Sequence, residues 1–115
     1  MTPGKYNIVI WRGGTWSIGI TSEDIDFTDY TSFRMQIRPP WVKSSPTQSA
    51  LLELTSANGR IVLEDGNSIL RLTIPAVNTA ALTFDEGAYE LELVNGDVVD
   101  KLLYGAVTVK GELTV

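Results

Sequence analysis

Residues 88–94 have the most regular pattern in the chain, Ala88-Tyr89-Glu90-Leu91-Glu92-Leu93-Val94. Large apolar side chains alternate with glutamates, and because successive side chains of a strand point to opposite faces, one face is apolar and the other is charged. Such a segment is typical of a β-strand that covers a core on one side and meets water on the other. Asn95-Gly96-Asp97 then suits a tight hairpin turn, so we expect a second strand at residues 98–109, with a bulge or bend at Gly105.

Apolar residues recur at every second position along nearly all the rest of the chain. We expect further strands at residues 6–11, 16–20, 33–38, 51–55, 60–64 and 69–75. Arg12-Gly13-Gly14-Thr15 and Ser56-Ala57-Asn58-Gly59 are predicted to be the turns of β-hairpins, each joining two paired strands. Pro39-Pro40 ends one strand, because proline cannot donate a ladder hydrogen bond. One turn of helix is expected at residues 78–82, with Asn78 as its N-cap.

Short strands at intervals of about 8–12 residues predict an all-β fold, an antiparallel β-sandwich of about eight strands with one short helical turn. A small closed barrel is the alternative. The length of 115 residues suits one hydrophobic core, so we expect a single β-sandwich domain over residues 1–115. Hydrophobic residues make up 43% of the chain and charged residues 20%, which is typical of a globular protein and argues against disorder.

The composition also argues against several classes of function. The chain has no cysteine and no histidine, which removes disulfides, cysteine nucleophiles and the commonest general base and metal ligand. Its 14 acidic and 9 basic residues give a net charge of −5, which disfavours nucleic-acid binding. No apolar run is long enough to insert in a membrane, and residues 1–5 lack the pattern of a signal peptide. We therefore expect a protein that is soluble in a cytoplasm, has no cofactor and is not an enzyme.

Two groups of carboxylates are candidate sites. The acidic cluster at Glu23, Asp24, Asp26 and Asp29 has oxygen ligands of the kind that calcium prefers. An EF-hand counted from Asp24 would need glycine at its sixth position and glutamate at its twelfth, and this chain has Asp29 and Met35 there, so we expect no metal site. Glycosidases use two carboxyl groups that face each other across the sugar. Neighbouring carboxylates on one outer face of a strand do not face each other in this way. We therefore expect the paired acidic residues of this chain to promote solubility.

Aromatic residues and the chain ends are the predicted contacts with a partner protein. Trp16 shares a face with Ile18 and Ile20 and is expected in the core, whereas Trp11 is on the face opposite Ile8 and Ile10. Large aromatic side chains are frequent anchors of interfaces, and terminal segments can pair with the free edge of a neighbouring sheet. The predicted partner contacts are Trp41, Pro40, Trp11, Tyr6 and Leu113.

Several stretches of the chain, in order, are similar to the sequences of one group of proteins. They are Trp11-Arg12-Gly13-Gly14-Thr15-Trp16, Asp29-Tyr30-Thr31-Ser32-Phe33-Arg34-Met35-Gln36-Ile37-Arg38, Asn58-Gly59-Arg60-Ile61, Leu72-Thr73-Ile74-Pro75-Ala76 with Thr79-Ala80-Ala81-Leu82, Gly87-Ala88-Tyr89-Glu90-Leu91-Glu92-Leu93, and Gly105-Ala106-Val107-Thr108-Val109. Their succession resembles small tail or baseplate proteins of tailed bacteriophages, similar to the N-terminal domain of upper baseplate proteins in lactococcal-type phages. Gly14 stands where those sequences usually have aspartate, and Asp29 where they usually have glycine.

The resemblance implies an immunoglobulin-like (Ig-like) β-sandwich in the virion, assembled in the host cytoplasm. It implies a structural protein that attaches fibre or receptor-binding components to the tail or baseplate, with other tail or baseplate proteins as partners and several copies in a symmetric assembly. It brings no catalytic residue. Two alternatives remain, a carbohydrate-binding module for host surface glycans and a decoration protein of the capsid.

Overall fold

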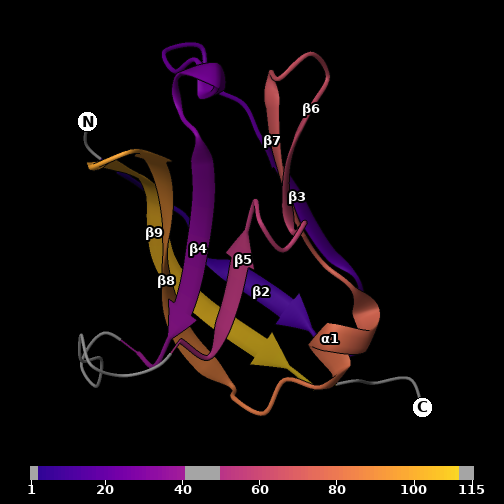
Figure 1. Ribbon diagram of the computed structural model, residues 1–115. Helices are drawn as coiled ribbons and strands as arrows, with labels where there is room; N and C mark the ends of the chain where they lie inside the picture. Colours follow the sequence, from indigo (N-terminus) through magenta and orange to yellow (C-terminus); the bar gives the residue numbers. More distant parts are fainter. Residues whose placement is uncertain (1–2, 41–49, 112–115) are drawn as a thin grey trace.

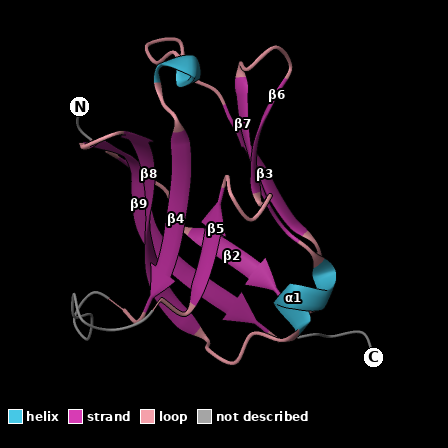
Figure 2. Ribbon diagram, in the orientation of Figure 1, coloured by secondary structure: helices cyan, strands magenta, loops and turns pink. Residues whose placement is uncertain are grey.

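The structure is a computed structural model, and it describes residues 3–40 and 50–111. Strands dominate the described chain (Figures 1 and 2). They are β1 (Gly4–Lys5), β2 (Ile8–Trp11), β3 (Trp16–Ile20), β4 (Ser32–Arg38), β5 (Leu52–Thr55), β6 (Ile61–Glu64), β7 (Ile69–Ile74), β8 (Glu86–Asn95) and β9 (Val98–Lys110). A turn of 3₁₀-helix at Phe27–Asp29 precedes β4, and the five-residue helix α1 (Ala76–Ala80) follows β7.

The strands form two sheets that pack face to face, which confirms the predicted β-sandwich. The larger sheet has the order β1-β9-β8-β4-β5, with β2 also paired to β9, and the smaller sheet has the order β3-β7-β6. The orders β9-β8-β4-β5 and β3-β7-β6 correspond to the strand orders G-F-C-C′ and B-E-D of variable-type immunoglobulin domains. The fold is therefore an Ig-like sandwich.

The core lies between the inward faces of the two sheets. The alternation in β8 is as predicted, since Tyr89, Leu91 and Leu93 are buried. Leu70, Leu72 and Ile74 of β7 face them from the other sheet and are also buried. Phe27 closes one end of the core, where its ring meets the ring of Phe33 edge to face at a centroid distance of 6.3 Å. Phe27 belongs to the 3₁₀ turn that precedes β4, so its burial anchors this turn to the core.

Two predicted hairpins are wrong. Residues 12–15 do not join two paired strands, because β2 pairs with β9 and β3 pairs with β7 in the other sheet. Residues 56–60 likewise lead from β5, which pairs with β4, to β6, which pairs with β7. Both segments are crossings between the two sheets. A glycine-containing turn fixes the local path of the backbone, but it does not decide which strand the next segment meets.

The N-terminal strands differ from the expected antiparallel arrangement. Both β1 and β2 pair with β9 in parallel, with Ile8 opposite Val107 and Trp11 opposite Lys110. The bulge of β9 is at Leu102 and not at Gly105, because Leu91 is opposite Leu103 while Glu92 is opposite Lys101. Helix α1 begins two residues earlier than predicted, after Pro75, and Asn78 lies inside it and is not its N-cap.

Candidate contact surface

An exposed apolar strip follows the edge of the larger sheet along β1 and β2. It consists of Tyr6, Val9 and Trp11, whose exposed fractions are 49%, 46% and 48%. Val9 and Trp11 point outward because Ile8 and Ile10, the intervening residues of β2, are buried in the core. We call these three residues the edge strip. Val9 and Trp11 share the outer face of this edge, and Tyr6 is exposed three residues before Val9, so the edge offers apolar area that another protein can bury.

The backbone at Tyr6 is held by three residues of β8 and β9. The Tyr89 hydroxyl donates a hydrogen bond of 2.6 Å to the Tyr6 carbonyl, and the Ala106 amide donates one of 3.1 Å to Asn7 Oδ1. Gly105 permits this approach, because a Cβ atom on it would lie 2.2 Å from the Tyr6 carbonyl oxygen. Burial, with a smaller contribution from the neighbouring Tyr6, raises the pKa of the Tyr89 phenol above its ordinary value. Tyr89 therefore keeps its proton and its bond to Tyr6 at neutral pH.

Arg12 fixes the other end of the edge strip. Its Nε atom donates to the Leu82 carbonyl at 3.0 Å, and its terminal nitrogen donates to the Phe84 carbonyl at 2.9 Å and to Asp85 Oδ1 at 2.8 Å. Beside it, the Lys110 ammonium lies 5.6 Å from the centre of the Trp11 ring, a cation–π contact. The Trp11 ring is thus held against β9 with one face toward a cation.

Thr79 of α1 fastens the crossing that follows Arg12. Its side chain is fully buried, and its hydroxyl accepts a hydrogen bond of 3.1 Å from the Gly13 amide. The hydroxyl also donates toward the carbonyls of Gly14 and Ala76, at 2.8 and 3.0 Å. The Arg12-Gly13-Gly14 stretch is therefore tied to α1 and to the segment that precedes β8. A hydroxyl in a five-residue helix could not be assigned this role from the sequence, because Gly13 and Gly14 are more than 60 positions away.

The predicted partner contacts do not all come together. Tyr6 and Trp11 both belong to the edge strip, and Pro40 is half-buried beyond the end of β4. Trp41 and Leu113 lie outside the described residues. Val9 was not singled out from the sequence, although the period-two pattern that places Trp11 outward places Val9 there too. The contact role of all these residues stays a prediction.

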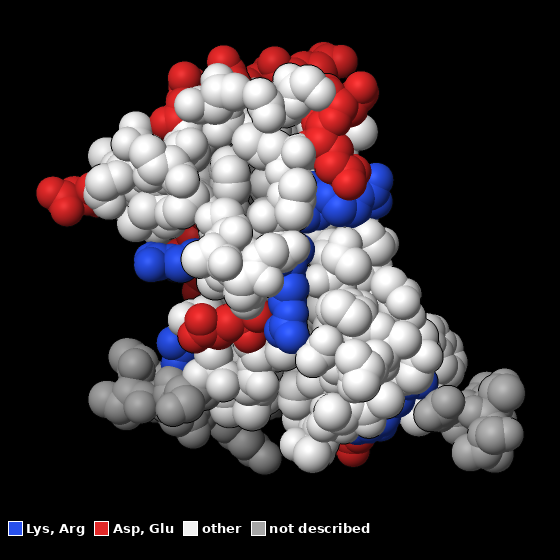
Figure 3. Space-filling model, turned by 45° about the vertical axis from the view of Figure 1, so that its right-hand side comes forward, with Lys and Arg blue, Asp and Glu red and all other residues white. Residues whose placement is uncertain are grey.

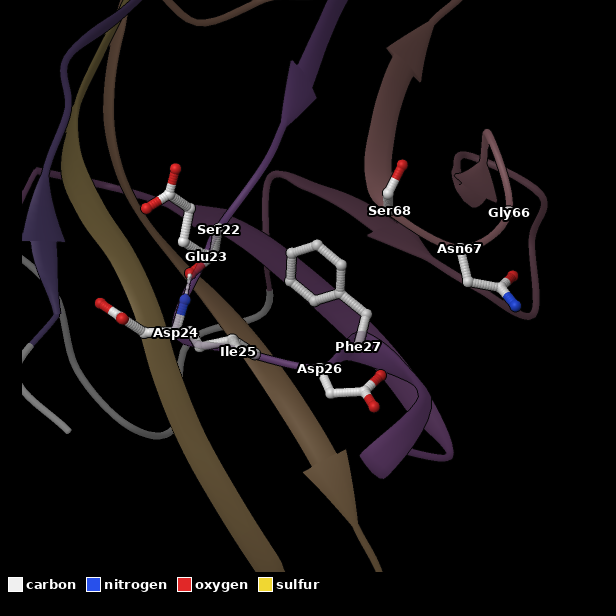
Figure 4. Close-up of a pocket in the computed structure, with 9 residues that line it drawn as sticks. All are labelled: Ser22, Glu23, Asp24, Ile25, Asp26, Phe27, Gly66, Asn67 and Ser68. Carbon is white, nitrogen blue, oxygen red and sulfur yellow. Dashed lines mark hydrogen bonds between the residues drawn. The ribbon is translucent and has the colours of Figure 1, made fainter.

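The acidic cluster lies at one end of the sandwich, where Figure 3 shows acidic side chains gathered. An open pocket of about 450 Å³ is formed there by residues 22–27 of the β3–β4 loop and 66–68 of the β6–β7 turn. Figure 4 shows that the carboxylates of Glu23, Asp24 and Asp26 point in different directions. Asp26 instead accepts hydrogen bonds from the Thr28 hydroxyl and amide, which hold the pKa of its carboxyl below the ordinary value. Within residues 3–40 and 50–111, no three acidic side chains are grouped to hold a metal ion.

Two glutamates of β8, Glu90 and Glu92, are paired with cations on the outer face of the larger sheet. Glu92 accepts a hydrogen bond of 2.6 Å from Arg34 Nε, and Glu90 is ion-paired with Lys101. The hydrogen bond to Glu90 is the main cause that raises the pKa of Lys101. Each carboxylate thus faces a basic neighbour and not a second carboxylate across a cleft.

Across the described part of the chain, no helix is long and apolar enough to span a membrane.

Comparisons with known proteins give a likeness of fold alone. No protein-family model and no curated protein matches the chain. Among solved structures, it is similar to the extracellular domain of the voltage-gated sodium channel β4 subunit, for which parallel homodimers and a role in cell–cell adhesion are described. The identity is 15%, the match covers 98% of this chain and 97% of that one, and the TM-score is 0.49. The strand order defines the class of this protein as an Ig-like β-sandwich. Because this fold has many functions, the function depends on the residues that the surface exposes.

Proposed function

We propose that this protein is a binding module without enzymatic activity, and that its edge strip contacts another protein. The observation that carries the proposal is the combination of exposure and rigidity at Tyr6 and Trp11. Their side chains are about half exposed, while Gly105, Tyr89 and Arg12 fix the backbone around them. Rigid aromatic anchors lose little conformational entropy on binding, so they are efficient contacts.

The partner that we propose is another component of a tailed bacteriophage particle. In this role the protein is a structural part of the tail or baseplate, present in several copies, and it attaches fibre or receptor-binding components. Support comes from the ordered resemblance between residues 11 and 109 described above. The pairing of Glu90 and Glu92 with cations on the outer sheet face is compatible with a structural role.

The decisive experiment is quantitative mass spectrometry of purified phage particles that encode this protein. We expect it in fixed ratio to tail or baseplate proteins. Absence from the particle would contradict the proposal, and a ratio that follows the major capsid protein would favour a capsid decoration protein.

A second experiment locates the contact. Trp11→Ala should reduce incorporation into particles, whereas Val62→Ala is the matched control, because Val62 is 47% exposed on β6 of the other sheet. Binding of host glycans by the isolated protein, weakened by Trp11→Ala, would instead indicate a carbohydrate-binding module.

A further inference from the structure

The outer edge of β3 has no partner strand within the described residues. Strand β3 pairs with β7 on one side, and the order β3-β7-β6 places it at the end of its sheet. In Ig-like sandwiches the first strand of the chain commonly pairs with the second strand, which corresponds to β3 in this protein. Here both N-terminal strands pair with β9 of the larger sheet, so no described residue occupies the position beside β3.

The side chains under this edge are incompletely covered. Trp16, Ile18 and Ile20 point toward the core but are only half-buried, whereas Leu70, Leu72 and Ile74, which pair with them from β7, are at most 1% exposed. An additional strand beside β3 would cover the three partly exposed side chains. An additional strand beside β2 of the larger sheet would cover little further apolar surface of the core, because Ile8 and Ile10 are already buried.

The β3 edge also lacks the features that usually prevent strands from pairing. Free edges are commonly blocked by charged residues, proline or a bulge. Strand β3 is Trp16-Ser17-Ile18-Gly19-Ile20, with no charge and no proline, and its five pairs with β7 run without a bulge. On the opposite side of the sandwich, the edge strands β5 and β6 are one residue shorter and carry Glu53 and Glu64.

We propose that β3 is a homodimer interface, in which β3 of a second copy pairs with it antiparallel about a two-fold axis at Ile18. Charge decides the direction and the occupant. Glu23, Asp24 and Asp26 follow β3, so parallel pairing would place two acidic loops side by side. Antiparallel pairing instead keeps the two acidic loops apart, because each lies near the start of the partner's β3, where Arg12 is neutralised by Asp85 and Lys110 is exposed. A two-fold pairing of one strand with its own copy is also the simplest closed assembly.

A single cysteine tests the register directly, because the chain has none of its own. Residues directly opposite in an antiparallel pair have Cα atoms about 4.5–5.5 Å apart, within the range of a disulfide. Ile18→Cys should therefore form a disulfide-linked dimer under mild oxidation. Val62→Cys, exposed on the opposite edge of the same sheet, is the control and should stay largely monomeric at equal protein concentration.

A second variant tests the interface without cross-linking. Ile18→Lys adds an inward-pointing charge whose long side chain can reach water at the edge, a device that natural edge strands use. We expect the dissociation constant of the dimer, measured by sedimentation velocity, to rise at least about tenfold, with Val62→Lys unchanged. Circular dichroism of both variants verifies that they are folded.

Three results would overturn the proposal. One is a wild-type chain that stays monomeric up to millimolar concentration while its β3 amides exchange rapidly. Another is a dimer that Ile18→Lys and Val62→Lys weaken equally. The third is a dimer that does not cross-link at position 18 and is lost when residues 112–115 are deleted, which would identify a C-terminal segment as the occupant. The pairing uses a different edge from the edge strip, so its failure leaves the proposed function untouched.

Discussion

Two of the four crossings between the sheets in the described chain, the first at residues 12–15 and the second at residues 56–60, are glycine-containing turns that are held by different kinds of contact. At residues 12–15, the bonds run to distant segments, from Arg12 to Leu82 and Phe84 and from Gly13 to Thr79. At residues 56–60, Asn58 makes the main bonds locally, since its side chain accepts from the amides of Thr55 and Arg60 and donates to the Glu53 carbonyl.

The difference shows that similar turn sequences can have different sources of stability. The second crossing is an Asn-Gly turn that its own residues can stabilise before the sheets meet. The first crossing has two glycines and one local bond, from the Gly14 amide to the Trp11 carbonyl, and it gains its side-chain hydrogen bonds only when α1 and the segment before β8 are in place. Substitutions at the anchors of the first crossing should therefore cost more than substitutions within the second.

The largest effect is expected at Gly105, which allows the N-terminal segment to reach β9. Gly105→Ala places a Cβ atom against the Tyr6 carbonyl, whose backbone must then move. We expect a loss of about 3 kcal/mol in the free energy of unfolding, measured by urea denaturation. Gly111→Ala is the control, because a Cβ atom there meets nothing within 4 Å. Equal stability of the two variants would refute the close approach.

Thr79→Val should have the next largest effect. Valine keeps the shape of the side chain but leaves the Gly13 amide and the Gly14 carbonyl without their partner, at a cost of about 2 kcal/mol. Thr79→Ser retains the hydroxyl and should lose much less. If valine and serine are equally stable, the first crossing does not depend on this hydroxyl.

Tyr89→Phe removes the hydrogen bond to Tyr6 and should cost about 1.5 kcal/mol at neutral pH. Burial of the Tyr89 phenol also gives a pH dependence. The pKa of Tyr89 is raised in the folded protein above the ordinary value of 10.0, so at high pH the unfolded chain loses this proton first. Stability should be intact below pH 10 and fall as pH rises above it. Denaturation between pH 9 and pH 11 should show a shallower fall for Tyr89→Phe, and identical slopes would contradict this role.

The smallest effect is expected at Asn58, in the second crossing. Asn58→Ala should cost about 1 kcal/mol, because the bonds it removes are exposed to water. Asn58→Asp keeps the acceptor oxygen for the amides of Thr55 and Arg60 and loses only the donor, so thermal unfolding should place it between wild type and alanine. If Asn58→Ala lowers the free energy of unfolding more than Thr79→Val does, the second crossing, and not the first, depends more on its anchoring side chain.

The sequence pattern predicts where most of the strands lie, but it does not predict which strands pair with each other. Alternation correctly marked Tyr89, Leu91 and Leu93 as buried, because burial of one strand face is a local property of period two. It could not reveal that residues 12–15 lead to another sheet, or that β2 runs parallel to β9, since both depend on contacts about 60 to 100 positions away. For the edge strip, the pattern identified Trp11 as outward-facing. The predicted bulge at Gly105 is wrong, because a glycine that permits a close backbone approach leaves the same signal in the sequence as a bulge does.

The parallel pairing of β2 with β9 also has a mechanical consequence. The described chain enters at one end of the sandwich and leaves near the other, as the N and C labels of Figure 1 indicate. Traction on the two ends pulls β2 and β9 in opposite directions along their common axis, so the bonds from Ile8 to Trp11 are loaded in shear and must fail together. A hairpin pulled at its open end would instead be unzipped one bond at a time. The terminal strands therefore form a clamp suited to bearing tension along the long axis.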